Sequence, residues 1–429
     1  MSPISHLIGM IVEIVTIGDE LLLGETIDIN AVWLARELGN VGISVVRRTT
    51  VGDGAGAISA AVLEALHRTG AVITTGGLGP TSDDRTRPAI AALFGRALRH
   101  DDAIWEGLRA LWRERGRPGE PPESNRQQAL VPEGATVLTN RHGTAPGLLL
   151  EDEEGRWVAM LPGVPREMRG IMNEELLPRL RSRTANDRRV IRSVTLRTTG
   201  IAESQLPDLL AEHADGFGSI SLAYLPGQEG VDLRLTVRDA RPEEADRTLR
   251  EAADTLRNRL GRHWYADGPT DLSEVVITAC RTQAKHLAVA ESCTGGLLAA
   301  RLTSISGSST AFLGGVIAYD NSVKIEQLGV PPELIDRVGA VSEDVAREMA
   351  SGVRRLLHSH VGVGITGVAG PEGGTPEKPV GLVWIAVDVE GHFAVHGGRF
   401  IGDRSEIRFR ATQAALNMVR RELAGTGTT

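Results

Sequence analysis

The chain has 429 residues, with 47 lysines and arginines against 55 aspartates and glutamates, and a formal net charge of −8. A hydrophobic content of 41% suffices for globular cores and excludes a wholly disordered chain, while the length suggests about two to four domains. The negative charge and the 3% aromatic content argue against a broad basic DNA surface and against an aromatic stacking platform for single-stranded nucleic acid.

Residues 10–180 alternate between apolar, β-branched runs and amphipathic stretches that end at glycine. This alternation predicts a doubly wound α/β domain with a mainly parallel sheet. The expected order is strand, helix, strand, helix, strand over residues 10–18, 29–42, 43–52, 57–70 and 71–77. We interpret residues 1–9 as a leader that the fold does not require.

Two polar turns follow strands of this domain. Thr16–Glu20 leaves the first strand, and the glycine-rich run Thr74–Asp84 leaves a later one. Ligands of open α/β sheets bind at the carboxyl ends of strands, where glycines let backbone N–H groups approach a phosphate. The neighbouring carboxylates of Asp83 and Asp84 would supply hard oxygen ligands for a divalent metal beside that phosphate. The alternative is a tight strand–helix connection with capping residues.

Residues 181–263 change to a strand, a short helix, a hairpin around Pro226–Gly230 and a charged helix. This order predicts a small α+β module that buries one face of its sheet under two helices. Residues 268–425 return to alternating helices and strands, which predicts a second α/β domain. The expected fold is therefore α/β, with two mainly parallel α/β domains joined by a small α+β module.

A candidate nucleophile lies in the C-terminal domain, where a predicted strand ends at Ser292 and a glycine-started helix is expected to follow. N–H groups at a helix N-terminus favour negative charge on an attacking oxygen. Lys324 would act as the base if burial lowers its pKa, with Tyr319 relaying the proton. The alternatives are that Ser292 and Thr294 are helix caps, that Cys293 is a buried apolar residue or itself the nucleophile, and that Lys324 is solvated.

The N-terminal domain carries four motifs that together resemble a known fold. They are TIGDELLLGE, INAVWLA, TGGLGPTSDD and LPGVPREM. They resemble the molybdopterin-binding fold and, more closely, the N-terminal domain of the CinA family. That resemblance implies an ADP-ribose pyrophosphatase that uses a divalent cation such as cobalt, magnesium or manganese, with potassium as an optional second ion. It implies substrate binding by Asn30, Gly76, Gly77, Gly79, Thr81 and Pro162, and metal binding by Asp19, Glu20, Asp83 and Asp84.

The C-terminal domain carries a second set of motifs, AESCTGG, GGVIAYDNSVK, ITGVAGPEGG and FIGDR. They resemble the C-terminal domain of the CinA family, a nicotinamide mononucleotide deamidase. The resemblance implies hydrolysis of the carboxamide to a carboxylate and ammonia without a cofactor. It implies Ser292 as nucleophile, Lys324 as general base and Tyr319 as a helper in proton transfer. It implies substrate binding by Thr294, Gly295, Gly296, Thr366, Arg404 and Arg408.

The middle module resembles the KH-type domain that joins the two catalytic domains in many CinA proteins. Its Gly227–Gly230 segment has the spacing of a KH nucleic-acid loop, but it lies in the predicted hairpin and contains an acidic residue. We therefore expect a spacer, a dimerisation surface or a lid rather than an RNA-binding module.

Two cysteines, Cys280 and Cys293, cannot build a disulfide framework, and no apolar run reaches the roughly 18–20 residues that span a bilayer. These features are typical of the reducing cytoplasm. The leading hypothesis is a cytoplasmic, homodimeric enzyme of pyridine nucleotide salvage that acts on nicotinamide mononucleotide and ADP-ribose, without membrane or nucleic-acid partners. The alternatives are a molybdopterin-binding protein and a non-enzymatic accessory protein of DNA uptake or repair.

Overall fold

The computed structural model describes residues 10–183 and 190–425, and the chain divides into two compact units. The first unit runs to Arg192 and includes Val237–Thr248, and the second comprises Ser193–Thr236 and the chain from Leu249 onward. The leader predicted before Met10 lies outside the described residues. Within these described ranges, no helix combines the length and the apolar character that a bilayer crossing requires.

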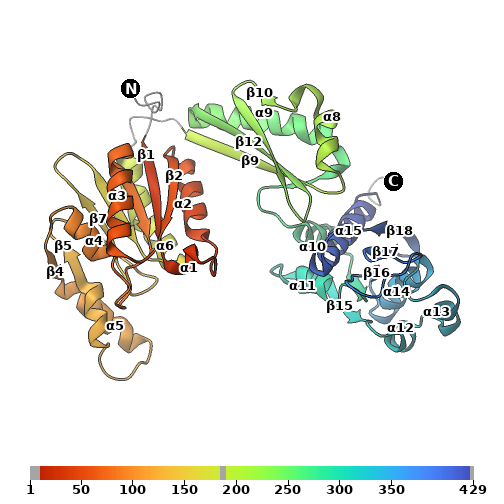
Figure 1. The fold of residues 1–429 in the computed structure, drawn as a ribbon. Coiled ribbons are helices and arrows are strands. Elements are labelled where there is room, and N and C mark those ends of the chain that lie inside the picture. Colours follow the sequence, from red (N-terminus) through yellow and green to blue (C-terminus); the bar gives the residue numbers. More distant parts are fainter. Residues whose placement is uncertain (1–9, 184–189, 426–429) are drawn as a thin grey trace. The chain divides into compact units, whose positions relative to one another are not determined.

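The N-terminal domain is built around a six-stranded sheet with the order β2-β1-β3-β8-β7-β6 (Figure 1). The first four strands of this order run parallel, and β7 and β6 are antiparallel. The strands are β1 (Ile11–Ile17), β2 (Ser44–Val51), β3 (Ala71–Thr75), β6 (Thr136–Leu138), β7 (Gly147–Glu151) and β8 (Trp157–Leu161), with β4 (Leu98–His100) and β5 (Leu130–Pro132) forming a separate two-stranded sheet.

Helices cover both faces of this sheet. On one face α2, α6 and α7 pack in one apolar cluster, and on the other face α3 and α4 pack in a second cluster. The central strand β1 places Val12 and Ile14 in the first cluster and Val15 and Ile17 in the second, as expected of a strand buried on both faces. The helices are α1 (Asp19–Leu22), α2 (Ile29–Asn40), α3 (Ala55–Thr69), α4 (Thr86–Leu93), α5 (Asp102–Glu114), α6 (Pro165–Ile171) and α7 (Leu177–Arg183).

The middle module has a five-stranded sheet with the order β10-β11-β12-β9-β13. Its strands are β9 (Val190–Thr198), β10 (Gly216–Phe217), β11 (Ile220–Pro226), β12 (Val231–Ala240) and β13 (Trp264–Asp267), and its helices are α8 (Leu206–Leu210) and α9 (Pro242–Leu260). The predicted hairpin is confirmed as β11 and β12. The sheet also continues beyond residue 263, because β13 pairs antiparallel with β9.

The C-terminal domain has a mixed sheet with the order β15-β14-β16-β17-β18. Strands β15, β14 and β16 run parallel, and β17 and β18 are antiparallel. The strands are β14 (Leu287–Glu291), β15 (Phe312–Ile317), β16 (Val361–Gly367), β17 (Leu382–Val389) and β18 (His392–Arg399). The expected α/β class, with an α+β module between two α/β domains, is confirmed.

The helices of the C-terminal domain also lie on both faces of the sheet. Helices α10, α11 and α15 pack on one face, and α12, α13 and α14 on the other. They are α10 (Leu272–Thr282), α11 (Leu297–Thr303), α12 (Asn321–Leu328), α13 (Pro332–Val338), α14 (Glu343–Leu356) and α15 (Arg404–Gly425). This layering brings the carboxyl ends of the three parallel strands to one edge, where the predicted motifs follow.

Candidate active site

Three strand ends meet around Ser292 in the C-terminal domain. The Ser292 N–H donates to the Ile365 carbonyl of β16 at 2.9 Å, and the Ala318 N–H after β15 donates to the Glu291 carbonyl at 2.8 Å. Ser292 therefore lies between the segment that follows β15, which leads to Tyr319 and Lys324, and the segment of β16 that contains Thr366. The structure brings these predicted residues to one edge of the sheet.

The turn after Ser292 is not a helix start. Helix α11 begins at Leu297, and its first amides are occupied by the buried carboxylate of Glu291. That carboxylate accepts from the N–H groups of Gly296 at 3.1 Å, Leu298 at 3.0 Å and Ala299 at 2.8 Å. The prediction that Ser292 draws on a helix N-terminus is therefore wrong, because an acidic side chain already satisfies those donors. The sequence signal for this arrangement is the position of Glu291, directly before Ser292.

Lys324 is almost completely buried, with 1% of its side chain exposed. Among the residues that the structure describes, its Nζ makes only long contacts, at 3.3 Å to the Tyr319 carbonyl, 3.5 Å to the Asp320 carbonyl and 3.4 Å to Asn321 Oδ1. Burial lowers the pKa of Lys324, while the negative charge of Asp320 acts in the opposite direction. The alternative of a solvated lysine is wrong, and an amine with a lowered pKa is suited to act as a base.

The environment of Cys293 does not suit the alternative nucleophile. Its thiol is 6% exposed, and burial raises the pKa of Cys293 to about 12. The charge of Glu291 raises this pKa further, and those of Arg408 and Arg404 lower it. Because the thiolate is the nucleophilic form of cysteine, a thiol that stays protonated at neutral pH is a poor nucleophile. The environment therefore favours Ser292.

Two arginines of α15 reach the same edge of the sheet. Arg404 donates to the Tyr319 hydroxyl at 2.9 Å and to the Gly370 carbonyl at 2.6 Å. Arg408 donates to the Thr294 carbonyl at 2.7 Å. The hydroxyl of the exposed Tyr319 ring thus accepts from Arg404, whereas the Tyr319 atom that Lys324 contacts is the backbone carbonyl oxygen. The structure does not join the Tyr319 hydroxyl to Lys324 in a proton relay.

The remaining predicted residues of this site shape the turn. The Thr294 hydroxyl is buried and has no hydrogen-bond partner among the described residues. The Thr366 hydroxyl donates to the Ala340 carbonyl at 2.8 Å. Gly295 and Gly296 have positive φ angles of 57° and 91°, which glycine adopts without strain.

A second candidate site lies in the N-terminal domain, at the ends of β3 and β8. Asn30 is 9% exposed, and its Nδ2 donates to Thr75 Oγ1 at 3.1 Å and to the Gly163 carbonyl at 2.7 Å. Thr75 donates in turn to the Pro162 carbonyl at 2.9 Å. The Asn30 Oδ1 is buried without a hydrogen-bond partner among the described residues. Asn30 and Thr75 line a cavity of about 130 Å³ together with Glu20, which fits a small polar ligand.

The glycine-rich loop of this domain is held together from within. Asp84 accepts from the N–H groups of Gly79 at 2.7 Å and Thr81 at 2.8 Å, and from the Thr81 hydroxyl. Gly77 has a φ of 64°, and a Cβ at this position would collide with the Thr86 hydroxyl. The predicted phosphate-binding residues Thr81 and Gly79 therefore also bind Asp84.

The predicted metal ligands do not form a ligand set. Asp84 is occupied by the loop, and Asp19 Oδ1 accepts from the Asp53 N–H at 3.3 Å. In the part of the chain that the structure describes, no group of three or more His, Cys, Asp or Glu side chains is arranged to hold a metal ion. Asp19, Glu20, Asp83 and Asp84 as placed thus do not fit a bound divalent cation, and we derive no chemical step through one.

Comparisons with known proteins cover the three regions in chain order. Family models match residues 13–182 as a probable molybdopterin binding domain, residues 193–266 as the damage-inducible protein CinA KH domain, and residues 269–423 as the CinA C-terminal domain.

Relatives match over nearly the whole length. A CinA-like protein of Gemmatimonas aurantiaca is 57% identical over 97% of this chain and 97% of its own. A putative competence-damage inducible protein of Moorella thermoacetica is 44% identical over 96% of this chain and 98% of its own. A crystal structure of the competence/damage inducible protein CihA from Agrobacterium tumefaciens is 39% identical, covers 36% of this chain and 93% of that chain, and has a TM-score of 0.35.

Proposed function

The chain belongs to the CinA family, and from that premise we propose that its C-terminal domain hydrolyses nicotinamide mononucleotide to nicotinic acid mononucleotide and ammonia. The observation that carries the proposal is the burial of Lys324 beside the turn of Ser292 and Cys293. A lysine that is buried without a carboxylate to pair with gains a lowered pKa, and that amine is a suitable base for a serine hydroxyl.

The proposed reaction has two steps. The neutral Lys324 amine takes the proton of the Ser292 hydroxyl, and Oγ attacks the carboxamide carbon. The C–N bond of the carboxamide then breaks, and the Lys324 ammonium gives the proton to the leaving nitrogen. Ammonia departs, and the acyl group stays on Ser292 as an ester. A water molecule then gives a proton to the same amine and attacks the ester carbon. The bond to Ser292 Oγ breaks, the Lys324 ammonium returns the proton to Oγ, and the acid product loses its proton to solvent and leaves as the carboxylate. Ser292 and Lys324 end in their starting states.

The substrate phosphate is assigned to Arg404 and Arg408. Over residues 10–183 and 190–425, both guanidinium groups donate to neutral oxygens, and neither is paired with a carboxylate. Their positive charges thus remain available to an anion. Arginine binds phosphate oxygens through two parallel N–H groups, which fixes the orientation of the ligand. We expect the phosphate to replace part of the Arg404 contact with Tyr319.

We also propose that the N-terminal domain binds and hydrolyses ADP-ribose. The Asn30 Oδ1 is buried and has no hydrogen-bond partner among the described residues, and Asn30 lines the cavity of about 130 Å³, which supports one ligand group that donates a hydrogen bond there. Ribose hydroxyls are such donors. A divalent cation stays part of this proposal only as a prediction from the family, since the acids as placed do not hold one.

The test is product formation by the full chain. Incubation with nicotinamide mononucleotide is expected to yield equal amounts of nicotinic acid mononucleotide and ammonia. The nicotinic acid mononucleotide is measured by chromatography. Nicotinamide riboside, which lacks the phosphate, is expected to react at least about tenfold more slowly. Arg404→Gln should shrink that difference, and Arg399→Gln, which changes an exposed arginine of β18 outside the assigned phosphate site, should preserve it. Absence of the acid product with a folded protein would overturn the proposal.

A further inference from the structure

The second unit contains a large cavity that has no role in the function proposed above. Its volume is about 840 Å³, within the range of pockets that hold small organic ligands. Five segments line it: the loop Thr199–Glu203 after β9, the hairpin turn Gly227–Val231, residues 262–263 before β13, part of β18 with Phe400, and one face of α15. None of the residues assigned above to nicotinamide mononucleotide or ADP-ribose lines this cavity.

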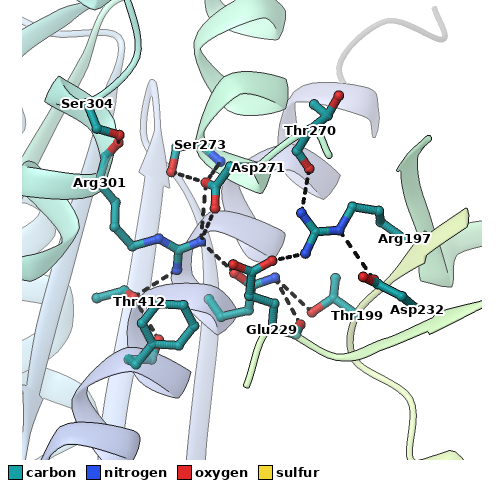
Figure 2. A network of polar contacts seen from close by, with 12 residues as sticks. Arg197, Thr199, Glu229, Asp232, Thr270, Asp271, Ser273, Arg301, Ser304 and Thr412 are labelled. Atoms are coloured by element: carbon teal, nitrogen blue, oxygen red, sulfur yellow. Dashed lines mark hydrogen bonds and ion pairs between the residues drawn. The ribbon is translucent and has the colours of Figure 1, made fainter. Parts of the chain in front are cut away.

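A polar network fixes the walls of the cavity (Figure 2). Gln413 of α15 is 4% exposed, and its Nε2 donates to the Glu229 carbonyl at 3.0 Å and to the Thr199 hydroxyl at 3.4 Å. Arg197 forms an ion pair with the Glu229 carboxylate, and Arg301 donates to Gln413 Oε1 at 2.8 Å. These contacts tie the hairpin turn and the loop after β9 to α15, so the cavity is formed before any ligand binds.

Unpaired positive charge lines this cavity. The side chains of Arg262, Arg410 and Arg421 form no hydrogen bond or ion pair with any residue that the structure describes, and Arg410 Nε is buried without an acceptor. A buried donor without a partner is costly, and an anionic ligand would satisfy its guanidinium. Of the acids at the cavity, Glu229 is already neutralised by Arg197.

The rest of the lining suits the other parts of a nucleotide. Phe400 and His396 lie edge to face with ring centroids 6.3 Å apart, which offers an aromatic surface to a planar ring. Glu203 and Glu422 supply carboxylates that accept from ribose hydroxyls. We propose that this cavity binds a nucleoside monophosphate, with Arg410 holding the phosphate and Phe400 contacting the base.

The test uses an azido derivative of AMP as a photoprobe on the full chain. Trypsin releases residues 411–420 as one peptide, which contains Gln413, Asn417 and the other cavity residues of that stretch of α15. Saturable labelling of this peptide is expected, with AMP as the competitor. Adenosine, which lacks the phosphate, should compete at least about tenfold more weakly. Labelling confined to other peptides, or equal competition by adenosine, would overturn the proposal.

Variants add a second readout. Arg410→Gln is expected to weaken AMP competition at least about tenfold, and the control Arg355→Gln, an exposed arginine of α14 outside the cavity, should leave it unchanged. Unchanged competition in a folded Arg410→Gln protein would also overturn the proposal. If Arg410→Gln does not fold, the proposal is tested on the parent protein by the position of the labelled peptide and by the comparison of AMP with adenosine.

Discussion

Replacing Lys324 by methionine should separate stability from activity. The two side chains have similar length, but methionine has no charge to bury and no proton to transfer. Lys324 is 1% exposed, and its three contacts at 3.3, 3.4 and 3.5 Å are longer than good N–H···O hydrogen bonds. We therefore expect Lys324→Met to be more stable than the parent and inactive as a deamidase.

The expected magnitude follows from the environment of the amine. A buried polar group without good hydrogen bonds costs about 1–3 kcal/mol, and the long contacts of Lys324 recover only part of that. The free energy of unfolding should therefore rise by about 1 kcal/mol in Lys324→Met. Loss of a general base typically slows a reaction by about 10²–10⁴-fold, so deamidation should fall by at least about a hundredfold.

The pH dependence has a definite sign. Burial lowers the pKa of Lys324 in the folded state, so below that pKa both the folded and the unfolded chains carry the proton and the full burial cost applies. Between the lowered pKa and the ordinary lysine pKa, the unfolded chain binds more protons, and stability rises with pH. Activity should rise through the same lowered pKa, because the neutral amine is the base. In Lys324→Met, this increase of the free energy of unfolding with pH should be absent.

Denaturant unfolding of parent and variant, with ammonia release from nicotinamide mononucleotide in parallel, tests both halves of this prediction. A chain with two units need not unfold in a single step. Unfolding should therefore be followed through a spectroscopic signal that comes from the second unit, which contains Lys324. A variant that unfolds at lower denaturant would show that the ammonium stabilises the fold. A variant that still deamidates would show that Lys324 is not the base.

Three further predictions concern neighbouring residues. Cys293→Ala should keep most of the deamidase activity, because burial keeps the thiol protonated, and loss of ammonia release in a folded variant would contradict this. Glu291→Ala removes the buried carboxylate that accepts from three N–H groups, and should lower the free energy of unfolding by about 1–3 kcal/mol in calorimetry; an unshifted transition would refute it. Asn30→Ala should reduce ADP-ribose hydrolysis while ammonia release stays unchanged, and parallel loss of both would contradict two separate sites.

Much of the fold followed from pattern alone. The buried strands with β-branched runs, such as β1, β3 and β14, and the hairpin of the middle module are where the sequence predicted them. No range was predicted for strand β18 (His392–Arg399), because HFAVHGGR combines two histidines with two glycines and lacks a regular apolar alternation. It is held by its pairing with β17, which is a tertiary contact that a local pattern does not show.

The candidate site was predictable as a set of residues but not in its electrostatics. Motif positions led to Ser292 and Lys324, and the sheet edge does bring their segments together. The occupation of the α11 amides by Glu291 was missed, since it depends on how the turn folds back. The deep burial of Lys324 depends on how α12 packs beside α14, and the contact of Tyr319 with Arg404 joins segments far apart in the chain. The homodimer stays a prediction.

The most direct test of the central claim is ammonia release from nicotinamide mononucleotide by the full chain without added metal, compared with Ser292→Ala. The account predicts catalytic release by the parent, with nicotinic acid mononucleotide as the second product, and none above background from the folded variant. Undiminished release by Ser292→Ala would contradict serine catalysis, and no release by a folded parent would contradict the deamidase assignment itself.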